Sequence, residues 1–216
     1  MSTLNIVYED DNIIVVDKPA GLIVEGGKPG EPDLESECRK YLKSHGEKPE
    51  IYVVYRLDKP VSGLIVLAKD AGSAAELSKQ IQDKTMKKQY EARVFVTKDY
   101  PNEAMLTDYL VKDPMNNVSR IVGKTSKGAK EAVLSYKTVS REDKTAVLRV
   151  DLMTGRHHQI RVQLSNAGLP LLGDQKYGNA ESIEYSRKNG IKDVALKAVG
   201  LSFFHPVSGQ KLEFKL

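Results

Sequence analysis

The chain has 216 residues, 40% of them hydrophobic, which is enough for a sizeable core and unlike the composition of a disordered protein. Its single cysteine, Cys38, excludes an internal disulfide and fits a reducing, cytoplasmic setting. No apolar stretch approaches the roughly 20 residues of a membrane span, and the N-terminus lacks the pattern of a signal peptide. We therefore expect a cytoplasmic protein without a membrane segment.

The net charge of +4 is unevenly distributed along the chain. Residues 1–50 contain 6 Lys/Arg and 11 Asp/Glu, a net −5, so residues 51–216 contain 27 and 18, a net +9. Such an asymmetry favours a polyanionic ligand, although it also occurs in ordinary enzymes.

The first half of the chain predicts a hairpin, a loop, two helices and two more strands. Asp33 and Asp70 are suited to cap the two helices, because a carboxylate at that position accepts hydrogen bonds from the first free amides. The expected ranges are strands 4–8 and 13–17, a Gly/Pro-rich loop over 18–32, a helix over 34–45, strands 51–54 and 63–68, and a helix over 71–83.

The second half predicts strands around one further helix. The residues TGRHHQIRVQLSNAG predict a helix that Thr154 caps and Gly168 ends. The other expected segments are a strand over 88–96, an irregular basic region over 98–129, strands 131–139 and 144–152, a polar loop over 173–192 with room for one helical turn, and strands 194–204 and 210–215.

About eight strands and three helices that do not alternate strictly indicate an α+β fold. We expect a large mixed, mostly antiparallel sheet with flanking helices. No linker-like segment or internal repeat divides the sequence, so residues 1–216 are predicted to form a single domain.

Nucleotide-cofactor and metal sites have little support in the sequence. Neither a P-loop pattern nor GxGxxG after a strand occurs. His157 and His158 are adjacent, and neighbours on a helix point about 100° apart, so they are poorly placed to share one ion. We expect no cofactor and no metal.

Asp58 is the first candidate catalytic residue. It lies in YRLDKP, just before the apolar strand of residues 63–68, where partial burial would raise the pKa of its carboxyl unless a cation stands beside it. An ionised carboxylate can serve as a nucleophile or base. The alternative is a turn ion pair with Arg56 or Lys59.

Arg161 and Tyr90 are the other candidates. Arg161 shares a helical face with Ile160 and Leu164, so it either points inward and needs a carboxylate or covers the core edge with its stem. Tyr90 begins a strand with one apolar face, where its ring can stack on a base or simply pack in the core.

Several motifs, in order, resemble the RluA-type pseudouridine synthases. They cover nearly the whole chain, which makes the resemblance specific. The matching segments are DKPAGL at 17–22, YRLD and VSGLIVLAK at 55–69, KKQYEARV at 87–94, GRHHQIRVQLSNAGLPLLGDQKYG at 155–178 and ALKAVGLSFFHPVSGQKLEF at 195–214.

The resemblance implies a pseudouridine synthase fold with a central catalytic cleft, and isomerisation of a specific uridine in ribosomal or transfer RNA without a cofactor. It aligns Asp58 with the catalytic aspartate, Tyr90 with the base-stacking tyrosine and Arg161 with the arginine that pairs with that aspartate. It also implies an RNA or base-pocket set, namely Arg56, Leu172, Arg156 and His158.

Three positions depart from the family pattern: Tyr55 and Lys197 replace histidines, and His157 stands where threonine is commoner. We expect them to affect substrate choice rather than chemistry. We also expect a monomer without the S4-type RNA-binding domain that many family members carry. The alternatives are a non-catalytic RNA-binding protein on the same fold, and a glycosidic hydrolase, which would need a second acid.

Overall fold

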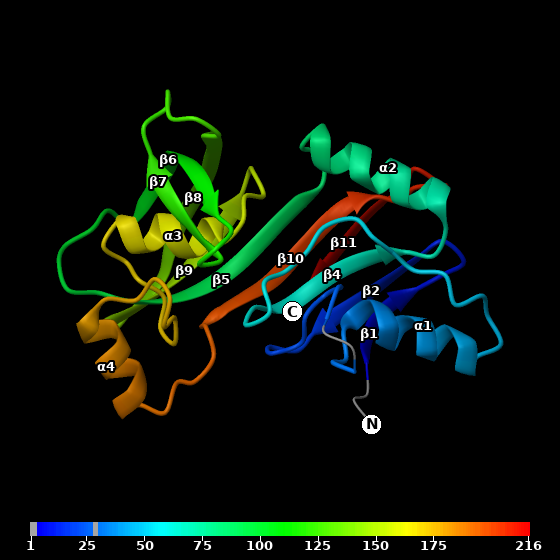
Figure 1. Cartoon of the computed structure of the whole chain (residues 1–216), viewed down its shortest axis with the longest axis horizontal. Helices are drawn as coiled ribbons and strands as arrows, with labels where there is room; N and C mark the ends of the chain where they lie inside the picture. Colours follow the sequence, from blue (N-terminus) through cyan, green and yellow to red (C-terminus); the bar gives the residue numbers. More distant parts are fainter. Residues whose placement is uncertain (1–3, 28–29) are drawn as a thin grey trace. The chain divides into compact units, whose positions relative to one another are not determined.

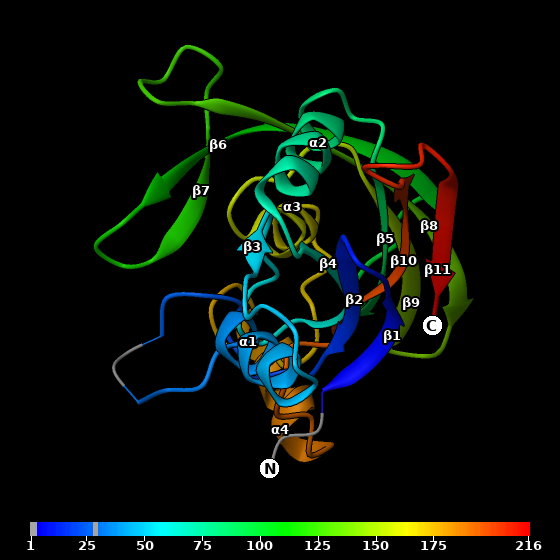
Figure 2. The same cartoon turned by 90° about the vertical axis from the view of Figure 1, so that its right-hand side faces the viewer.

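The computed structural model describes residues 4–27 and 30–216, which group into two compact units (Figure 1; Figure 2). The first unit comprises the chain up to Lys87 together with Ala198–Leu216. The second unit comprises Lys88–Lys197. Part of the loop predicted over residues 18–32 lies outside the described residues.

The first unit contains a sheet with two helices. The strand β2 (Ile13–Lys18) pairs antiparallel with β1 (Asn5–Glu9) and with β4 (Ser62–Ala68), which also pairs with the short β3 (Tyr52–Val53). The strand β10 (Leu196–Phe204), most of which belongs to this unit, lies next to β4 and pairs antiparallel with β11 (Lys211–Lys215).

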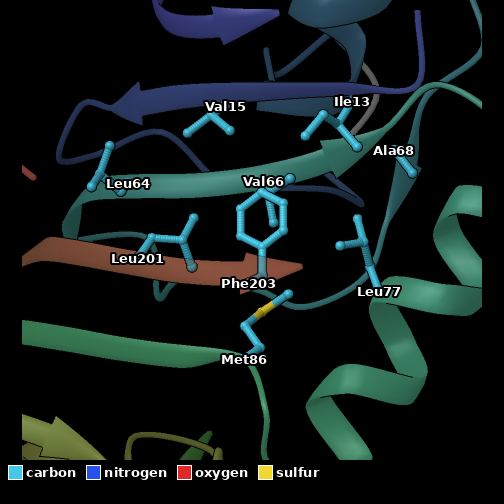
Figure 3. Close-up of a cluster of buried hydrophobic side chains, with 9 residues drawn as sticks. All are labelled: Ile13, Val15, Leu64, Val66, Ala68, Leu77, Met86, Leu201 and Phe203. Carbon is cyan, nitrogen blue, oxygen red and sulfur yellow. The ribbon is translucent and has the colours of Figure 1, made fainter. Parts of the chain in front are cut away.

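The core of this unit lies between the sheet and α2. Figure 3 shows β2, β4 and β10 contributing side chains to one buried cluster with Leu77 and Met86. Val15, Val66 and Phe203 in that cluster are at most 1% exposed. Each such side chain stabilises the fold by about 1.5–3 kcal/mol, so this sheet is a firm support for the loops at its ends.

The two helices of the first unit begin where the sequence predicts. The helix α1 (Leu34–Ser44) is capped by Asp33, whose side chain accepts a 2.7 Å hydrogen bond from the Ser36 amide. The helix α2 (Ala71–Gln82) is capped by Asp70 through the Ser73 amide at 2.8 Å. Cys38 is fully buried on the inner face of α1.

The second unit contains an antiparallel sheet in the order β5-β9-β8-β6-β7. These strands are β5 (Lys87–Phe95), β6 (Glu103–Asp113), β7 (Val118–Val122), β8 (Lys130–Arg141) and β9 (Thr145–Leu152). The helix α3 (Gln159–Asn166) packs its buried Val162 against Leu110 and Ala132. A second helix, α4 (Ala180–Lys188), follows.

The α+β class and the mostly antiparallel sheet are confirmed, but three local predictions were wrong. Residues 98–129 are not irregular throughout, because they contain β6 and β7. The polar loop over 173–192, where one helical turn was expected, contains the nine-residue helix α4, which Asn179 caps. The helix expected from Thr154 begins only at Gln159.

The late start of α3 follows from a different use of the Thr154 side chain. Its hydroxyl donates to the Gln159 side chain at 2.8 Å and accepts from the Val133 amide, so it ties the turn to β8 instead of capping a helix. His158 takes the N-cap position with a left-handed φ of 53°. Among residues 4–27 and 30–216, no helix has the length and apolar character needed to cross a bilayer.

Candidate active site

The predicted site residues fall in both units. Asp58 and Arg56 belong to the first unit, whereas Tyr90, Arg156, His158, Arg161 and Leu172 belong to the second. The meeting of Asp58 with Tyr90 and Arg161 in one cleft stays a prediction.

Asp58 lies half-buried in a turn that enters β4. The Val61 amide donates a 2.9 Å hydrogen bond to the Asp58 carbonyl and closes this turn. Arg56 and Lys59, the cations that a local ion pair would use, lie 3.1 Å from Glu25 and 2.7 Å from Glu31. The turn is thus bound to neighbouring acids by residues that flank Asp58.

Lys18, which the sequence reasoning missed, is a fully buried cation beside this turn. Its ammonium donates to the carbonyl oxygens of Pro19 at 2.9 Å, Leu22 at 2.7 Å and Lys59 at 3.4 Å. Desolvation lowers the pKa of Lys18 to about 8, and the negative charge of Asp58 opposes that shift. Lys18 is therefore still protonated at neutral pH and places a positive charge near Asp58.

Close packing of glycine fixes the strand that follows Asp58. Gly63 has a φ of 113°, and a Cβ there would overlap the backbone of Ala198. Only glycine allows this approach between β4 and β10. The turn that carries Asp58 is therefore held at the start of a rigid strand.

Tyr55, just before this turn, packs against the buried cluster of β2, β4 and β10. Burial raises the pKa of its hydroxyl. The sequence assigned this position to substrate-specific differences, but in the structure its ring contributes to the core.

Arg161 points inward from α3 and is only 5% exposed. Its guanidinium donates two hydrogen bonds to Asp174, from Nε at 2.8 Å and from a terminal nitrogen at 2.9 Å. The alternative, in which the Arg161 stem covers the core edge and its guanidinium reaches water, is thus wrong. Asp174, which the sequence reasoning did not identify, binds one edge of this guanidinium.

Asp174 is itself buried. Its carboxylate also accepts the backbone amides of Lys176 at 3.0 Å and Tyr177 at 3.2 Å. Burial alone would raise its pKa, but the hydrogen bonds and charge of Arg161 hold that pKa below its usual range. The preceding Gly173 has a φ of 74°, where a Cβ would overlap the Asp193 carbonyl, so the backbone here is fixed by packing.

Tyr177 and His158 complete this cluster. The Arg161 guanidinium lies 5.2 Å from the centroid of the Tyr177 ring, and the Tyr177 hydroxyl lies 2.8 Å from His158 Nδ1. Desolvation, and then the charge of Arg161, lower the pKa of His158 to about 3. His158 is therefore neutral at pH 7 and can contribute hydrogen bonding or stacking, but not a positive charge.

The remaining predicted residues of the second unit differ in burial. Tyr90 on β5 is 5% exposed and pairs in register with Val150. Leu172 is fully buried, and its backbone pairs with Arg93. Arg156 is exposed and donates from Nε to the Glu131 carbonyl at 2.8 Å.

The two adjacent histidines stack with ring centroids 3.7 Å apart. They precede α3 instead of lying on it, so the helical argument against a shared ion does not apply to them. Over the described part of the chain, no group of three His, Cys, Asp or Glu side chains is arranged to hold a metal ion.

Comparison with known proteins identifies the family. The family model described as RNA pseudouridylate synthase matches residues 12–166. The ribosomal large subunit pseudouridine synthase D of Neisseria meningitidis serogroup A is 36% identical over 221 residues, covering 98% of this chain and 57% of the relative. The dual-specificity RNA pseudouridine synthase RluA of Vibrio cholerae is 33% identical, covering 95% of this chain and 79% of the relative.

The fold agrees with these matches. A structure titled human RNA pseudouridylate synthase domain containing 4 aligns with a TM-score of 0.80 at 23% identity, covering 98% of this chain and 87% of that one. The chain spans little more than half the length of the Neisseria relative. By the family match and by these identities, the chain belongs to the RNA pseudouridylate synthase family.

Proposed function

We propose that this chain isomerises a uridine of ribosomal or transfer RNA to pseudouridine, with Asp58 as the catalytic carboxylate. Family membership supports the reaction class. The observation that carries the assignment of Asp58 is its half-buried position in a fixed turn close to the buried Lys18. The two are close enough for the negative charge of Asp58 to oppose the lowering of the Lys18 pKa by burial. A positive charge nearby favours an ionised aspartate at pH 7.

The reaction needs no added atoms. The bond between N1 of uracil and C1′ of ribose breaks, the base turns, and C5 bonds to C1′ while the C5 proton is lost and N1 gains one. Asp58 must be ionised whether it attacks the sugar, attacks the base or removes a sugar proton. Each of these routes starts from the same carboxylate.

Tyr90 and Arg161 take supporting roles in this proposal. The target base must leave its stack, which costs a few kcal/mol, and stacking on an aromatic ring such as Tyr90 returns about 1–3 kcal/mol. Arg161, oriented by Asp174 through two hydrogen bonds, adds in this proposal a second positive charge that keeps Asp58 ionised. Arg56, Arg156, His158 and Leu172 complete the proposed RNA and base-pocket set.

The names of relatives support the substrate class. One is named for the large ribosomal subunit and another for dual specificity. We propose ribosomal or transfer RNA as the substrate on that basis, with the chain acting as a monomer in the cytoplasm and without a cofactor.

The test replaces Asp58 and maps pseudouridine in cellular RNA with and without the gene. Cells that carry only the Asp58→Asn variant should lack the pseudouridine that the wild-type gene restores, while the purified variant keeps its RNA affinity. Asp83→Asn, which changes an exposed carboxylate of the first unit, is the matched control and should restore modification. Pseudouridine formation by Asp58→Asn would contradict the assignment, and RNA binding without modification by the wild type would favour a non-catalytic protein.

A further inference from the structure

The net charge of the chain is concentrated in the segment of residues 112–130, which includes the β6–β7 turn and the loop that leads to β8. This segment contains five cations and one acid, a net +4, so the other residues together sum to zero. All five cations are exposed in the structure, namely Lys112, Arg120, Lys124, Lys127 and Lys130. Figure 2 shows β6 and β7 reaching out to one side of α3.

The tip of this hairpin is a preformed turn. The Asp113 carboxylate accepts the amides of Met115 at 3.0 Å and Asn116 at 3.3 Å, and it also accepts the Asn116 side chain at 2.8 Å. Asn117 continues the turn with a left-handed φ of 49°. A turn bonded in this way loses little entropy when a ligand binds to it.

Met115 stands at the end of this turn and is 94% exposed. An apolar side chain gains nothing from such a position in the folded monomer, because it buries no surface there. Apolar wedges such as Met are used to contact unstacked bases or enter a base step, next to cations that hold the phosphates.

The turn end of the hairpin is anchored to residues next to α3. Ser119, which is 3% exposed, donates its amide to the Tyr177 hydroxyl at 2.7 Å and its hydroxyl to the His157 carbonyl at 2.6 Å. Lys176 donates to the Asn117 carbonyl at 2.8 Å. The hairpin is thus fixed to the part of the second unit that contains Arg161 and Asp174.

We propose that residues 112–130 form an RNA-binding surface in which the five cations contact phosphates and Met115 contacts an unpaired base. The inference rests on the proposed function in one respect, because it takes the RNA that binds this surface to be the substrate. It adds a binding surface that is separate from the catalytic residues. A protein partner at the same tip would use Met115 as an anchor but would not require the surrounding positive charge.

The charge part of the proposal is tested by the salt dependence of RNA binding. The probe is a short fluorescein-labelled RNA stem-loop, with binding followed by anisotropy over a range of KCl concentrations. The double variant Lys124→Gln/Lys127→Gln should reduce the slope of log affinity against log salt by about 1.4–1.8, because each lost phosphate contact accounts for about 0.7–0.9. The matched control Lys40→Gln/Lys43→Gln removes the same charge from α1 and should leave the slope unchanged.

The apolar part is tested with Met115→Ala. Affinity for the stem-loop should fall by about tenfold, equivalent to about 1.4 kcal/mol, with the salt slope unchanged. Affinity for a fully paired duplex of the same composition should change much less. Met105→Ala is the matched control, because Met105 is 63% exposed on β6, the strand that leads to the turn, but about 27 Å from the turn by strand geometry.

The outcomes separate this inference from the proposed function. If the wild type binds RNA through the hairpin but forms no pseudouridine, the surface stands and the catalytic proposal fails. If pseudouridine forms while the hairpin variants bind like their controls, the surface is wrong. Failure of the wild type to bind either RNA would also overturn it, as would an equal loss on both RNAs for Met115→Ala.

Discussion

At the scale of single residues, the candidate site is built on buried charges that other buried groups satisfy. Arg161 and Asp174 are almost completely buried and bonded to each other, while Lys18 is buried among carbonyl oxygens. Buried pairs of this kind add little net stability compared with apolar residues, but loss of one partner leaves an uncompensated charge. Such groups fix geometry more than they strengthen the fold.

Replacement of Asp174 tests this view. Asp174→Asn should lower the free energy of unfolding by about 3–5 kcal/mol at pH 7, because the buried Arg161 would lose the carboxylate that accepts two of its hydrogen bonds. Urea denaturation followed by circular dichroism measures the change. Asp193→Asn is the control, because its carboxylate is exposed in the same unit, and it should unfold like the wild type. Equal stability of the two variants would mean that the buried pair is dispensable.

The sequence indicated Arg161 but not Asp174, and the reason is physical. Arg161 shows the helical spacing of an inward face, whereas Asp174 lies 13 residues later in a loop without periodicity. Its burial depends on Gly173 and on amides that only the folded loop brings together. Lys18 was missed for a similar reason, because a lysine next to a proline does not by itself indicate burial.

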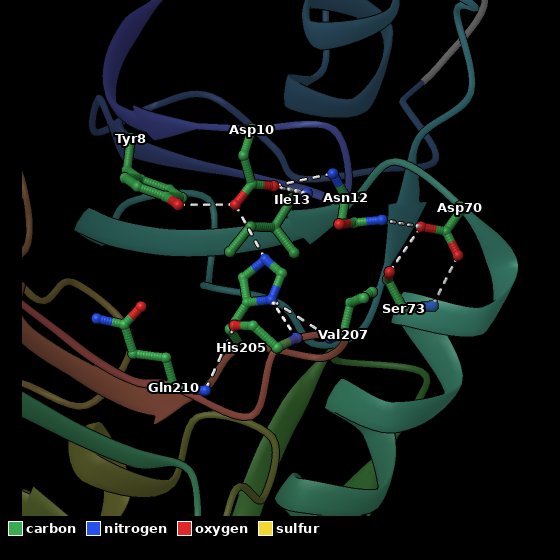
Figure 4. A network of polar contacts seen from close by, with 10 residues as sticks. Tyr8, Asp10, Asn12, Ile13, Asp70, Ser73, His205, Val207 and Gln210 are labelled. Atoms are coloured by element: carbon green, nitrogen blue, oxygen red, sulfur yellow. Dashed lines mark hydrogen bonds and ion pairs between the residues drawn. The ribbon is translucent and has the colours of Figure 1, made fainter.

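At the scale of elements, short polar networks join the strand ends of the first unit. Figure 4 shows Asp10, after β1, receiving the Tyr8 hydroxyl and the amides of Asn12 and Ile13, with His205 on its other side. His205 follows β10, so the Asp10 carboxylate connects the end of β1 to the end of β10. Burial would raise the pKa of Asp10, but the hydrogen bonds from Asn12, Tyr8 and Ile13 lower it.

The lowered pKa sets the direction of a pH effect. A carboxyl with a folded pKa below its unfolded value stabilises the fold above the unfolded pKa, about 3.9, and loses this contribution as the pH falls through the folded value. Asp10→Asn should therefore cost about 1 kcal/mol at pH 7 and less in acid. Thermal melting between neutral and acidic pH measures this difference, with the neighbouring exposed Asp11→Asn as control. If Asp10→Asn destabilised the protein equally at every pH, the pKa of Asp10 would not be lowered in the folded state.

The contact between β4 and β10 gives a second prediction at this scale. Gly63→Ala should cost well over 2 kcal/mol, because the new Cβ would overlap the Ala198 backbone as well as strain a positive φ. Gly209 also has a positive φ, of 70°, but a Cβ there would meet no atom within 4 Å, so Gly209→Ala should show only the conformational cost of about 1–2 kcal/mol. The melting temperatures of the two variants separate the cost of the overlap from the conformational cost. Similar values would mean that β4 and β10 can move apart at little cost.

Elements with a regular apolar pattern, either a stripe or a continuous run, were predictable, and those without one were not. The helices α1 and α2 follow from their caps and buried stripes, and β4 follows from its continuous apolar run. The strand β6 has one buried residue, Leu110, among eleven, and its sequence EAMLTDYLVKD does not alternate apolar with polar residues as a recognisable strand would. Its pairing with β7 and β8, not its own pattern, makes it a strand.

At the scale of the whole molecule, both boundaries between the compact units fall within strands. One boundary follows Lys87 at the start of β5, and the other follows Lys197 near the start of β10. Domains that unfold separately are usually joined by exposed, flexible linkers with few contacts, and neither crossing has that character. We therefore propose that residues 1–216 unfold as the single catalytic domain that the sequence predicts.

The only cysteine provides the measurement. Cys38 is fully buried in the first unit, and burial raises the pKa of its thiol to about 12, so the folded chain should resist thiol reagents at pH 8. In increasing urea, labelling of Cys38 should follow the same transition as the loss of β-sheet circular dichroism, because one cooperative step exposes the thiol and melts both units. A Cys38→Ala variant controls for labelling elsewhere. Labelling at clearly lower urea than the loss of sheet would show that the first unit opens alone, and the single-domain proposal would then fail.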